Sequence, residues 1–224
     1  EIWRYPLNGT TFSQAERVCD IVPGPGNSEP MWLTVMDGTL YFSAYREAEG
    51  RELWMSDGLP NGTTDIVMDI NPGPESSDPQ YTSVEYDGGG DGDKKFNRSF
   101  ATIGGSIYFA ATEPTHGYEL WSSDGTGMGT AIAADINPGV GSSFVRGITL
   151  LNGRLLMNAY EPSVGWEWWV YNTGANLPPV AVATASPTTG TAPLTVSFDG
   201  SGYSDPEDGS NITYACDFGD GVGS

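Results

Sequence analysis

The chain has 224 residues, of which 31 are glycine, 16 are proline and 12% are aromatic, whereas only 17% are charged. This composition is typical of short β-strands joined by tight turns and excludes a helical bundle. A net charge of −20 repels phosphate backbones and anionic lipid surfaces, so nucleic acid is not expected as a partner. Divalent cations, cationic surfaces and neutral glycans stay open, and acidity that keeps a secreted protein soluble explains the charge most simply.

The ends of the chain and its hydropathy give three further expectations. No apolar run approaches the roughly 20 residues of a transmembrane helix, so we expect no membrane insertion by this segment. The chain begins with neither an initiator methionine nor a charged-then-apolar leader, which indicates a mature or partial chain. Cys19 and Cys216 fall in different predicted domains and are not expected to pair with each other.

A tryptophan motif occurs four times and dominates the chain. Its tryptophans are separated by 51, 67 and 48 positions, so the period is about fifty residues, with an acidic glycine-rich insertion in the long interval. The four copies are Glu1-Ile2-Trp3, Glu52-Leu53-Trp54, Glu119-Leu120-Trp121 and Glu167-Trp168-Trp169. The first three are followed by a second motif, Asp-Ile-x-Pro-Gly, beginning at Asp20, Asp69 and Asp135, which indicates a strand that ends in a turn.

The spacing of turns and apolar residues predicts four strands per repeat. The first copy supplies only its last two strands, and the best-preserved copy predicts strands around 31–36, 39–45, 51–56 and 64–70. Each later repeat opens with a hairpin whose turn is Asp37-Gly38, Gly104-Gly105 or Asn152-Gly153. A four-stranded sheet with apolar residues on both faces must stack on its neighbours, with the repeated Trp between them. We therefore expect a β-propeller-like region over 1–173, with two full and two partial blades.

The third copy resembles a known family of secreted proteins. Its residues Glu119 to Thr126 read Glu-Leu-Trp-Ser-Ser-Asp-Gly-Thr, which matches the Glu-Leu-Trp-x-x-Asp-Gly-Thr (ELWxxDGT) repeat signature. The resemblance covers about 1–173 and implies an extracellular location. Leu59 departs from the signature's Thr, and the fourth copy lacks the Asp-Gly-Thr turn. Missing blades upstream or an open stack would both satisfy the sequence.

A second module begins after a proline-containing connector at 174–179. The segments around Asp199 and Ser204 to Gly209, followed by Asp217-Phe218-Gly219-Asp220-Gly221, are similar to a polycystic-kidney-disease (PKD) domain. That resemblance implies the N-terminal part of an immunoglobulin-like β-sandwich over 180–224, a module that serves as an extracellular spacer or adhesive unit. The chain stops after the Asp-Phe-Gly-Asp-Gly motif, so we expect the later strands to lie in further sequence.

The polar residues of the repeat favour a structural role over catalysis. His116 is the only histidine, which leaves Ser-His-Asp and histidine-ligated metal chemistry poorly supported. A catalytic pair is needed once, whereas the repeat carries its carboxylates in each copy, where they are expected to accept backbone N–H bonds. These repeat residues are Glu52, Glu119, Glu167, Asp69 and Asp135, beside the tryptophans Trp3, Trp54, Trp121 and Trp169. We expect no enzyme and no obligatory cofactor.

Two kinds of surface site stay open. Asp87, Asp91 and Asp93 are the best calcium candidates, although Lys94 and Lys95 follow them and a solvated acidic insertion is the simpler interpretation. Asp205, Glu207 and Asp208 form a weaker candidate, which a turn explains equally well. Asn-x-Ser/Thr glycosylation sequons occur at four positions, Asn8, Asn61, Asn97 and Asn211.

The sequence hypothesis is an extracellular or cell-surface structural and adhesive protein, a rigid non-catalytic repeat scaffold of a large surface protein or external filament. Its partners would be other copies or other extracellular structural proteins, with glycans as a further class. The alternative is a secreted carbohydrate-active enzyme or glycan-binding protein that uses the propeller as a scaffold, which fold analogy alone supports. Calcium-dependent adhesion is a third option.

Overall fold

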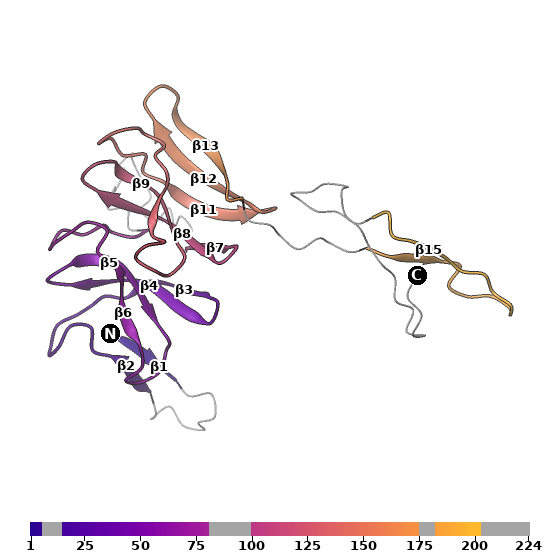
Figure 1. Cartoon of the computed structure of the whole chain (residues 1–224), viewed down its shortest axis with the longest axis horizontal. Helices are drawn as coiled ribbons and strands as arrows, with labels where there is room; N and C mark the ends of the chain where they lie inside the picture. The colour runs from indigo at the N-terminus through magenta and orange to yellow at the C-terminus, as the bar shows by residue number, and fades with distance from the viewer. Residues whose placement is uncertain (6–14, 81–99, 175–181, 203–224) are drawn as a thin grey trace, which may run out of the picture. The chain divides into compact units, whose positions relative to one another are not determined.

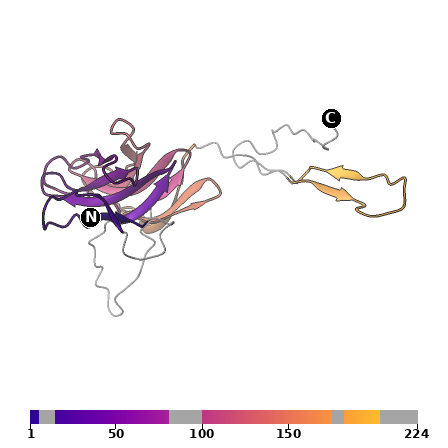
Figure 2. The same cartoon turned by 90° about the horizontal axis from the view of Figure 1, so that it is seen from below.

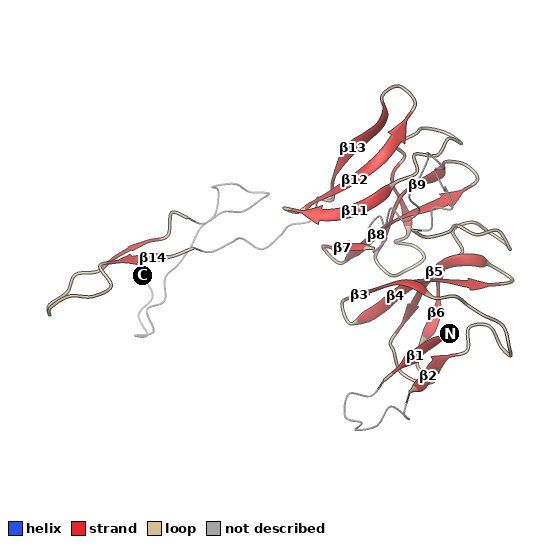
Figure 3. Cartoon of the chain, turned by 180° about the vertical axis from the view of Figure 1, so that it is seen from behind, coloured by secondary structure: helices blue, strands red, loops and turns tan. Residues whose placement is uncertain are grey.

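The chain folds into small antiparallel sheets. The computed structural model describes residues 1–5, 15–80, 100–174 and 182–202, and these contain strands and turns but no helix (Figure 3). The all-β class is therefore confirmed. A bilayer-spanning helix does not occur in the described ranges. The chain divides into two compact units, Glu1–Thr173 and Gly174–Ser224.

Four sheets follow one another in chain order within Glu1–Thr173 (Figure 1). The first sheet pairs β1 (Ile2–Arg4) with β2 (Glu16–Cys19). The second is the meander β3 (Met31–Met36), β4 (Thr39–Arg46), β5 (Gly50–Ser56) and β6 (Thr64–Met68). The third is the meander β7 (Ala101–Ile103), β8 (Ser106–Glu113), β9 (Gly117–Ser123) and β10 (Ala131–Ala134). The fourth contains β11 (Arg146–Leu151), β12 (Arg154–Glu161) and β13 (Gly165–Asn172).

The second unit contains a two-stranded antiparallel ribbon in its described part. The ribbon pairs β14 (Thr184–Ser186) with β15 (Ser197–Asp199), and its three pairs join Thr184 to Asp199, Ala185 to Phe198 and Ser186 to Ser197. The described strands of the whole chain form no closed barrel or propeller ring (Figure 2).

The hairpin turns have the backbone that their sequences require. Asp37 and Gly38 have φ of 49° and 79°, and Asn152 and Gly153 have φ of 49° and 74°. Two successive positive φ values make a type I′ turn, whose twist matches that of the flanking strands. The first two strands of each repeat are therefore joined with no spare residue, which fixes the register of Met36 against Thr39 and of Leu151 against Arg154.

The core of the repeat unit lies between successive sheets, and each sheet contributes two different faces. The face that contains the repeated Trp of β5 or β9 is called the Trp face here, and the opposite face, which contains the residue before that Trp, is called the Leu face. Between the first two sheets, the Leu face of the first meets the Trp face of the second. That buried cluster comprises Ile2, Val18, Ile21, Phe42, Ala44 and Trp54.

The next interface repeats this arrangement position by position. The Leu face of the second sheet contributes Leu53, Val67 and Ile70, which correspond to Ile2, Val18 and Ile21 of the first sheet. The Trp face of the third sheet contributes Phe109, Ala111 and Trp121, which correspond to Phe42, Ala44 and Trp54. Trp54 is 2% exposed and Trp121 is 6% exposed. One packing solution is therefore used at both interfaces.

The two outer tryptophans of the repeat lie in different surroundings. Trp3 is 60% exposed, because the sheet that would cover its face is not part of the described fold. Trp169 is half-buried against the third sheet, where Tyr171 of the same strand has its ring 6.0 Å from that of Tyr108. The expectation that the repeated Trp lies between stacked sheets therefore describes Trp54 and Trp121 but not Trp3.

Truncation of a buried repeat tryptophan should unfold the repeat unit more easily. We expect Trp54→Ala to lower the free energy of unfolding by about 3 to 5 kcal/mol, because it leaves a cavity between two sheets. Trp168→Ala is the control, since Trp168 is 72% exposed on the next-but-one sheet, and its effect in dilute solution should stay within about 0.5 kcal/mol. Urea unfolding followed by circular dichroism measures both, and equal losses would contradict the packing described here.

Candidate functional site

A buried carboxylate holds each complete repeat together. Glu52 lies in the middle of β5 with no exposed surface. Its Oε1 accepts the backbone N–H of Ser77 at 2.8 Å, and its Oε2 accepts the N–H of Ile70 at 3.1 Å and the hydroxyl of Ser77. Both oxygens are thus used by the loop that follows β6. This arrangement of a strand Glu, an Ile N–H and a Ser is called the Glu–Ser clasp here.

The third sheet repeats the clasp with the same atoms. Glu119 Oε1 accepts the N–H of Ser143 at 2.8 Å, and Oε2 accepts the Ser143 hydroxyl at 2.6 Å and the Ile136 N–H at 2.8 Å. In the first sheet, Glu1 accepts the N–H groups of Ile21 at 2.7 Å and Val22 at 3.2 Å. The repeated Glu therefore fixes the path of the chain after each of the first three sheets.

Glu167 differs from the other copies. It is exposed, whereas Glu52 and Glu119 are fully buried. The physical reason is in the sequence, because no Ile-Asn-Pro-Gly segment follows β13 to supply the N–H and hydroxyl donors. Gly165 reports the same change, since a Cβ there would meet nothing within 4 Å, whereas one at Gly50 would lie 2.6 Å from the carbonyl oxygen of Glu75.

The serines of the clasp are the residues that sequence reasoning missed. Ser77 and Ser143 each lie four positions after the glycine of a Pro-Gly pair, and Ser28 occupies the same place in the first copy. All three are fully buried. The recurrence of Ser four positions after each Pro-Gly pair was a signal for a structural role. A single Ser in a turn does not by itself indicate that role, because its carboxylate partner is distant in sequence.

Each clasp serine also bonds to the next sheet. The carbonyl oxygen of Ser28 accepts the N–H of Tyr45 at 2.7 Å, that of Ser77 accepts the N–H of Thr112 at 2.8 Å, and that of Ser143 accepts the N–H of Tyr160 at 2.7 Å. Tyr45, Thr112 and Tyr160 occupy the same position on β4, β8 and β12. Ser77 and Ser143 are therefore joints, with one side bound to the Glu of their own sheet and the other to the following sheet, whereas Ser28 is bonded through its carbonyl to the following sheet and its hydroxyl has no hydrogen-bond partner among the described residues.

The residue after each joint has a backbone that side chains rarely adopt. Glu29, Asp78 and Phe144 have φ of 43°, 49° and 52°. These three residues have unrelated side chains, so the conformation is imposed by the surrounding bonds and not by local preference. The N–H of Asp78 bonds to the Arg51 carbonyl at 3.2 Å, and that of Phe144 bonds to the Tyr118 carbonyl at 3.3 Å.

The aspartates of the repeat lie in turns. Asp57 accepts the N–H of Leu59 at 2.9 Å and that of Thr63 at 2.8 Å, and Asp124 accepts the N–H of Thr126 at 2.8 Å. Asp69 accepts the N–H of Gly73 at 3.1 Å, whereas Asp135 is exposed. The strand expected over 64–70 ends at Met68, because Asp69 and Ile70 already belong to the turn that supplies the clasp.

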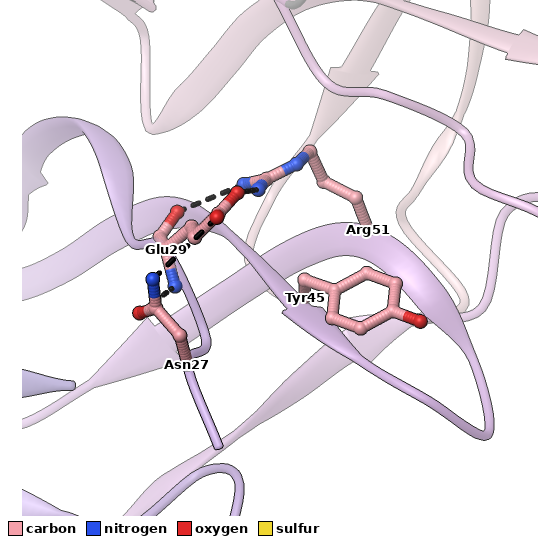
Figure 4. A pocket seen from close by; sticks show the side chains of 4 residues that line it. All are labelled: Asn27, Glu29, Tyr45 and Arg51. Carbon is pink, nitrogen blue, oxygen red and sulfur yellow. Dashed lines mark hydrogen bonds and ion pairs between the residues drawn. The ribbon is translucent and has the colours of Figure 1, made fainter. Parts of the chain in front are cut away.

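A shallow pocket lies beside the first joint and is lined by Asn27, Glu29, Tyr45 and Arg51 (Figure 4). Arg51 is buried and donates to the Glu29 carboxylate and to the Glu29 carbonyl, both at 2.9 Å. The side chain of Asn27 accepts the N–H of Glu29 at 3.1 Å. The charged residues that line the pocket thus pair with each other and hold the strained Glu29 backbone in place. This arrangement indicates a structural role for the pocket residues.

The remaining predicted sites fall into two groups. Asn61 is exposed in a turn, and its glycosylation stays a prediction. Asn8, Asn97 and Asn211 and the calcium candidates Asp87, Asp91 and Asp93 lie outside the described residues, as do Asp205, Glu207, Asp208 and Cys216. Within the described ranges, no group of three or more His, Cys, Asp or Glu side chains is arranged to hold a metal ion.

The single histidine has a local partner. His116 Nδ1 lies 2.5 Å from the Glu113 carboxylate, three residues away in the turn between β8 and β9, and the same carboxyl group accepts the His116 N–H at 2.7 Å. The sister turns carry Glu49 and Val164 at the position of His116. The imidazole is therefore part of a turn that other side chains also form.

Comparisons with family models, with curated proteins and with solved structures found no match to this chain.

Burial changes the acidity of the clasp carboxyls. Burial raises the pKa of Glu52 to about 7 from its ordinary value of 4.5, and the hydrogen bonds from Ser77 and Ile70, which favour the charged form, offset only part of this rise. The pKa of Glu119 is raised for the same reason, against the opposing hydrogen bonds of Ser143 and Ile136. The clasp is therefore a pH-sensitive element of stability.

The clasp should make stability fall as the pH rises. Because the native pKa of Glu52 lies above its unfolded value, the native state binds the proton more tightly, so this contribution is complete below about pH 4.5 and is lost as the pH passes 7. We expect the difference in unfolding free energy between wild type and Glu52→Gln to change by about 3 kcal/mol between pH 4 and pH 8. Denaturant titrations across this range measure it.

Glu167→Gln is the matched control for this experiment, because the same residue type at the same repeat position is exposed. Its effect on the free energy of unfolding should stay within about 0.5 kcal/mol, because it changes an exposed side chain that lies outside any clasp. A pH-independent difference for Glu52→Gln would contradict the burial of an ionisable clasp.

Proposed function

We propose that the chain is part of an extracellular structural or adhesive protein, in which propeller-like repeats and a PKD-like module are strung together as a rigid, non-catalytic scaffold. The observation that carries the proposal is the joint: the same serine carbonyl links successive sheets at 2.7 Å, 2.8 Å and 2.7 Å. The repeated polar residues of this chain hold successive sheets in register, which suits a rigid scaffold.

The state of the carboxylates supports the absence of catalysis. An acid or base acts through oxygens that can reach a substrate. Both oxygens of Glu52 and of Glu119 are instead occupied by N–H and hydroxyl donors of the chain itself and have no exposed surface. The charged groups beside the pocket, Arg51 and Glu29, are paired with each other. Repetition of a fully engaged carboxylate thus favours a scaffold over a hydrolase.

The composition supports an extracellular location. The charge of −20 disfavours nucleic acid and anionic membranes as partners, and the exposed Asn61 sequon suits a chain that passes through a glycosylating compartment. The resemblance to secreted ELWxxDGT repeats and to PKD modules, which act as spacers, agrees with both points. Propeller blades are the proposed form of the four-stranded sheets, and a sandwich is the proposed form of the second module.

The proposal predicts where the protein is found. Antibodies raised against the purified chain should label the outside of intact source cells or their external structures in immunogold electron microscopy. Treatment of intact cells with a protease should remove the label, and an antibody against an interior protein serves as the control. Label confined to the cell interior, or release of sugar from a polysaccharide panel by the purified chain, would contradict the scaffold.

A further inference from the structure

The pocket beside Ser28 has hydrogen-bonding capacity beyond its structural role (Figure 4). A guanidinium has five N–H donors and a carboxylate has about four acceptor sites, so the pair of Arg51 and Glu29 leaves several of each unused. Among the described residues, no Arg51 nitrogen is both buried and without a partner, so its spare donors are open to the pocket. The Asn27 amide lies 3.5 Å from Glu29 Oε1, which is longer than an ordinary hydrogen bond. Spare donors and spare acceptors therefore lie next to each other.

The balance of charge in the pocket indicates a neutral ligand. Arg51 and Glu29 form an ion pair at 2.9 Å, so the pair offers no net charge to an anion or a cation. A hydroxyl group both donates and accepts hydrogen bonds, so it can bond to a guanidinium and a carboxylate that already pair with each other. The net charge of −20 also repels anionic polymers. A neutral compound with several hydroxyl groups is the ligand class that fits.

An aromatic ring lies beside these polar groups. Tyr45 is 38% exposed and pairs across the strands β4 and β5 with Arg51, and both side chains line the pocket (Figure 4). The ring presents an apolar surface with a polar tip, which suits the C–H face of a sugar ring. The pocket has a volume of about 380 Å³, at the lower end of the range for ligand sites. This volume and lining suit a single sugar residue.

The pocket residues do not recur, although the backbone around them does. The serine carbonyl that bonds to the next sheet is the same at Ser28, Ser77 and Ser143. The four pocket positions, which are Asn27, Glu29, Tyr45 and Arg51 around Ser28, carry Ser76, Asp78, Thr112 and Tyr118 around Ser77, and Ser142, Phe144, Tyr160 and Trp166 around Ser143. Repetition marks the residues that hold the sheets together, so residues that change within the same backbone are where one copy can acquire a ligand of its own.

We propose that this pocket binds a sugar residue of a neutral polysaccharide, with Tyr45 against the C–H face of the sugar ring and the Arg51–Glu29 pair at its hydroxyl groups. The Asn27 amide is placed to bond a further hydroxyl. This inference goes beyond the proposed scaffold, because it gives the scaffold a point of attachment to a glycan matrix. Binding without cleavage is expected, since the Glu29 carboxylate is engaged by Arg51.

Affinity electrophoresis of the full chain tests the proposal. The folded chain runs in native gels that contain dextran, mannan, galactomannan or soluble starch, and its mobility is compared with that in a gel without polysaccharide. A polymer is the suitable probe for a shallow site, because it offers many copies of the sugar along one chain. At least one of these neutral polysaccharides should retard the wild type. Alginate, which is anionic, should leave its mobility unchanged.

Two variants borrow the residues that the chain itself uses around Ser77, so both should keep the fold, which thermal unfolding checks. Tyr45→Thr removes the aromatic ring and should raise the dissociation constant, taken from mobility against polysaccharide concentration, by about tenfold. Asn27→Ser removes an amide and should raise it by about threefold. Tyr5→Ala is the matched control, because it removes a ring that is 41% exposed outside the pocket, and it should be retarded as the wild type is.

Four results would overturn the inference. They are a wild type that none of the four neutral polysaccharides retards, equal retardation by alginate, a Tyr45→Thr chain that is retarded like the wild type, and an equal loss in Tyr5→Ala. The scaffold proposal fails by different readouts, which are label confined to the cell interior and release of sugar. A chain that labels the cell surface but migrates without retardation would therefore remove the sugar site and leave the scaffold.

Discussion

The fold depends on the fact that each of these sheets has two apolar faces. A sheet of about fifty residues can bury only one face against its own loops, so the other needs a neighbour. The chain pairs its faces in a fixed way: the residue before the repeated Trp packs against the following sheet, and the Trp packs against the preceding sheet. Leu53 and Trp54 therefore belong to different clusters although they are adjacent in sequence. Stability of one sheet is thus inseparable from that of the next, as in other quasi-one-dimensional repeats.

Apolar faces alone would allow sheets to slide, and the Glu–Ser clasp removes that freedom. A buried carboxylate is costly unless its lone pairs are satisfied, so a misplaced loop would leave Glu52 without partners. The correct path gives it three donors and, through the same serine, presents a carbonyl to the next sheet. The clasp therefore contributes specificity: it penalises the wrong register more than it stabilises the right one. The positive φ at Asp78 is the strain that this geometry requires.

The sequence predicted those parts of the fold that follow from local chemistry. The strands expected around 31–36, 39–45 and 51–56 are found at Met31–Met36, Thr39–Arg46 and Gly50–Ser56, because a type I′ turn at Asp37-Gly38 fixes both strands around it. The role of Ser77 could not be found in this way, since it depends on a contact with a carboxylate 25 positions earlier. The exposure of Glu167 was missed for the same reason. The fourth copy keeps Glu167 and Trp169, and the absence of the later turn and loop changes their surroundings.

The few basic residues of this acidic chain, which has a net charge of −20, serve local contacts. Four of the nine basic residues lie on the two end sheets, which are Arg4 and Arg17 on the first and Arg146 and Arg154 on the fourth. Arg17 stands directly across from Trp3, and Arg146 lies over Trp166.

On the first sheet both arginines are paired with acidic neighbours: Arg4 lies 2.7 Å from the Glu16 carboxylate, and Arg17 lies 3.0 Å from that of Asp20. Exposed pairs of this kind add little to stability, but they offset the basic charge where it stands. On the fourth sheet Arg146 donates to the Asn158 side chain at 3.1 Å and lies 3.9 Å from the centre of the Trp166 ring. The guanidinium therefore orders an aromatic ring and a strand residue together, and its charge is used inside the sheet.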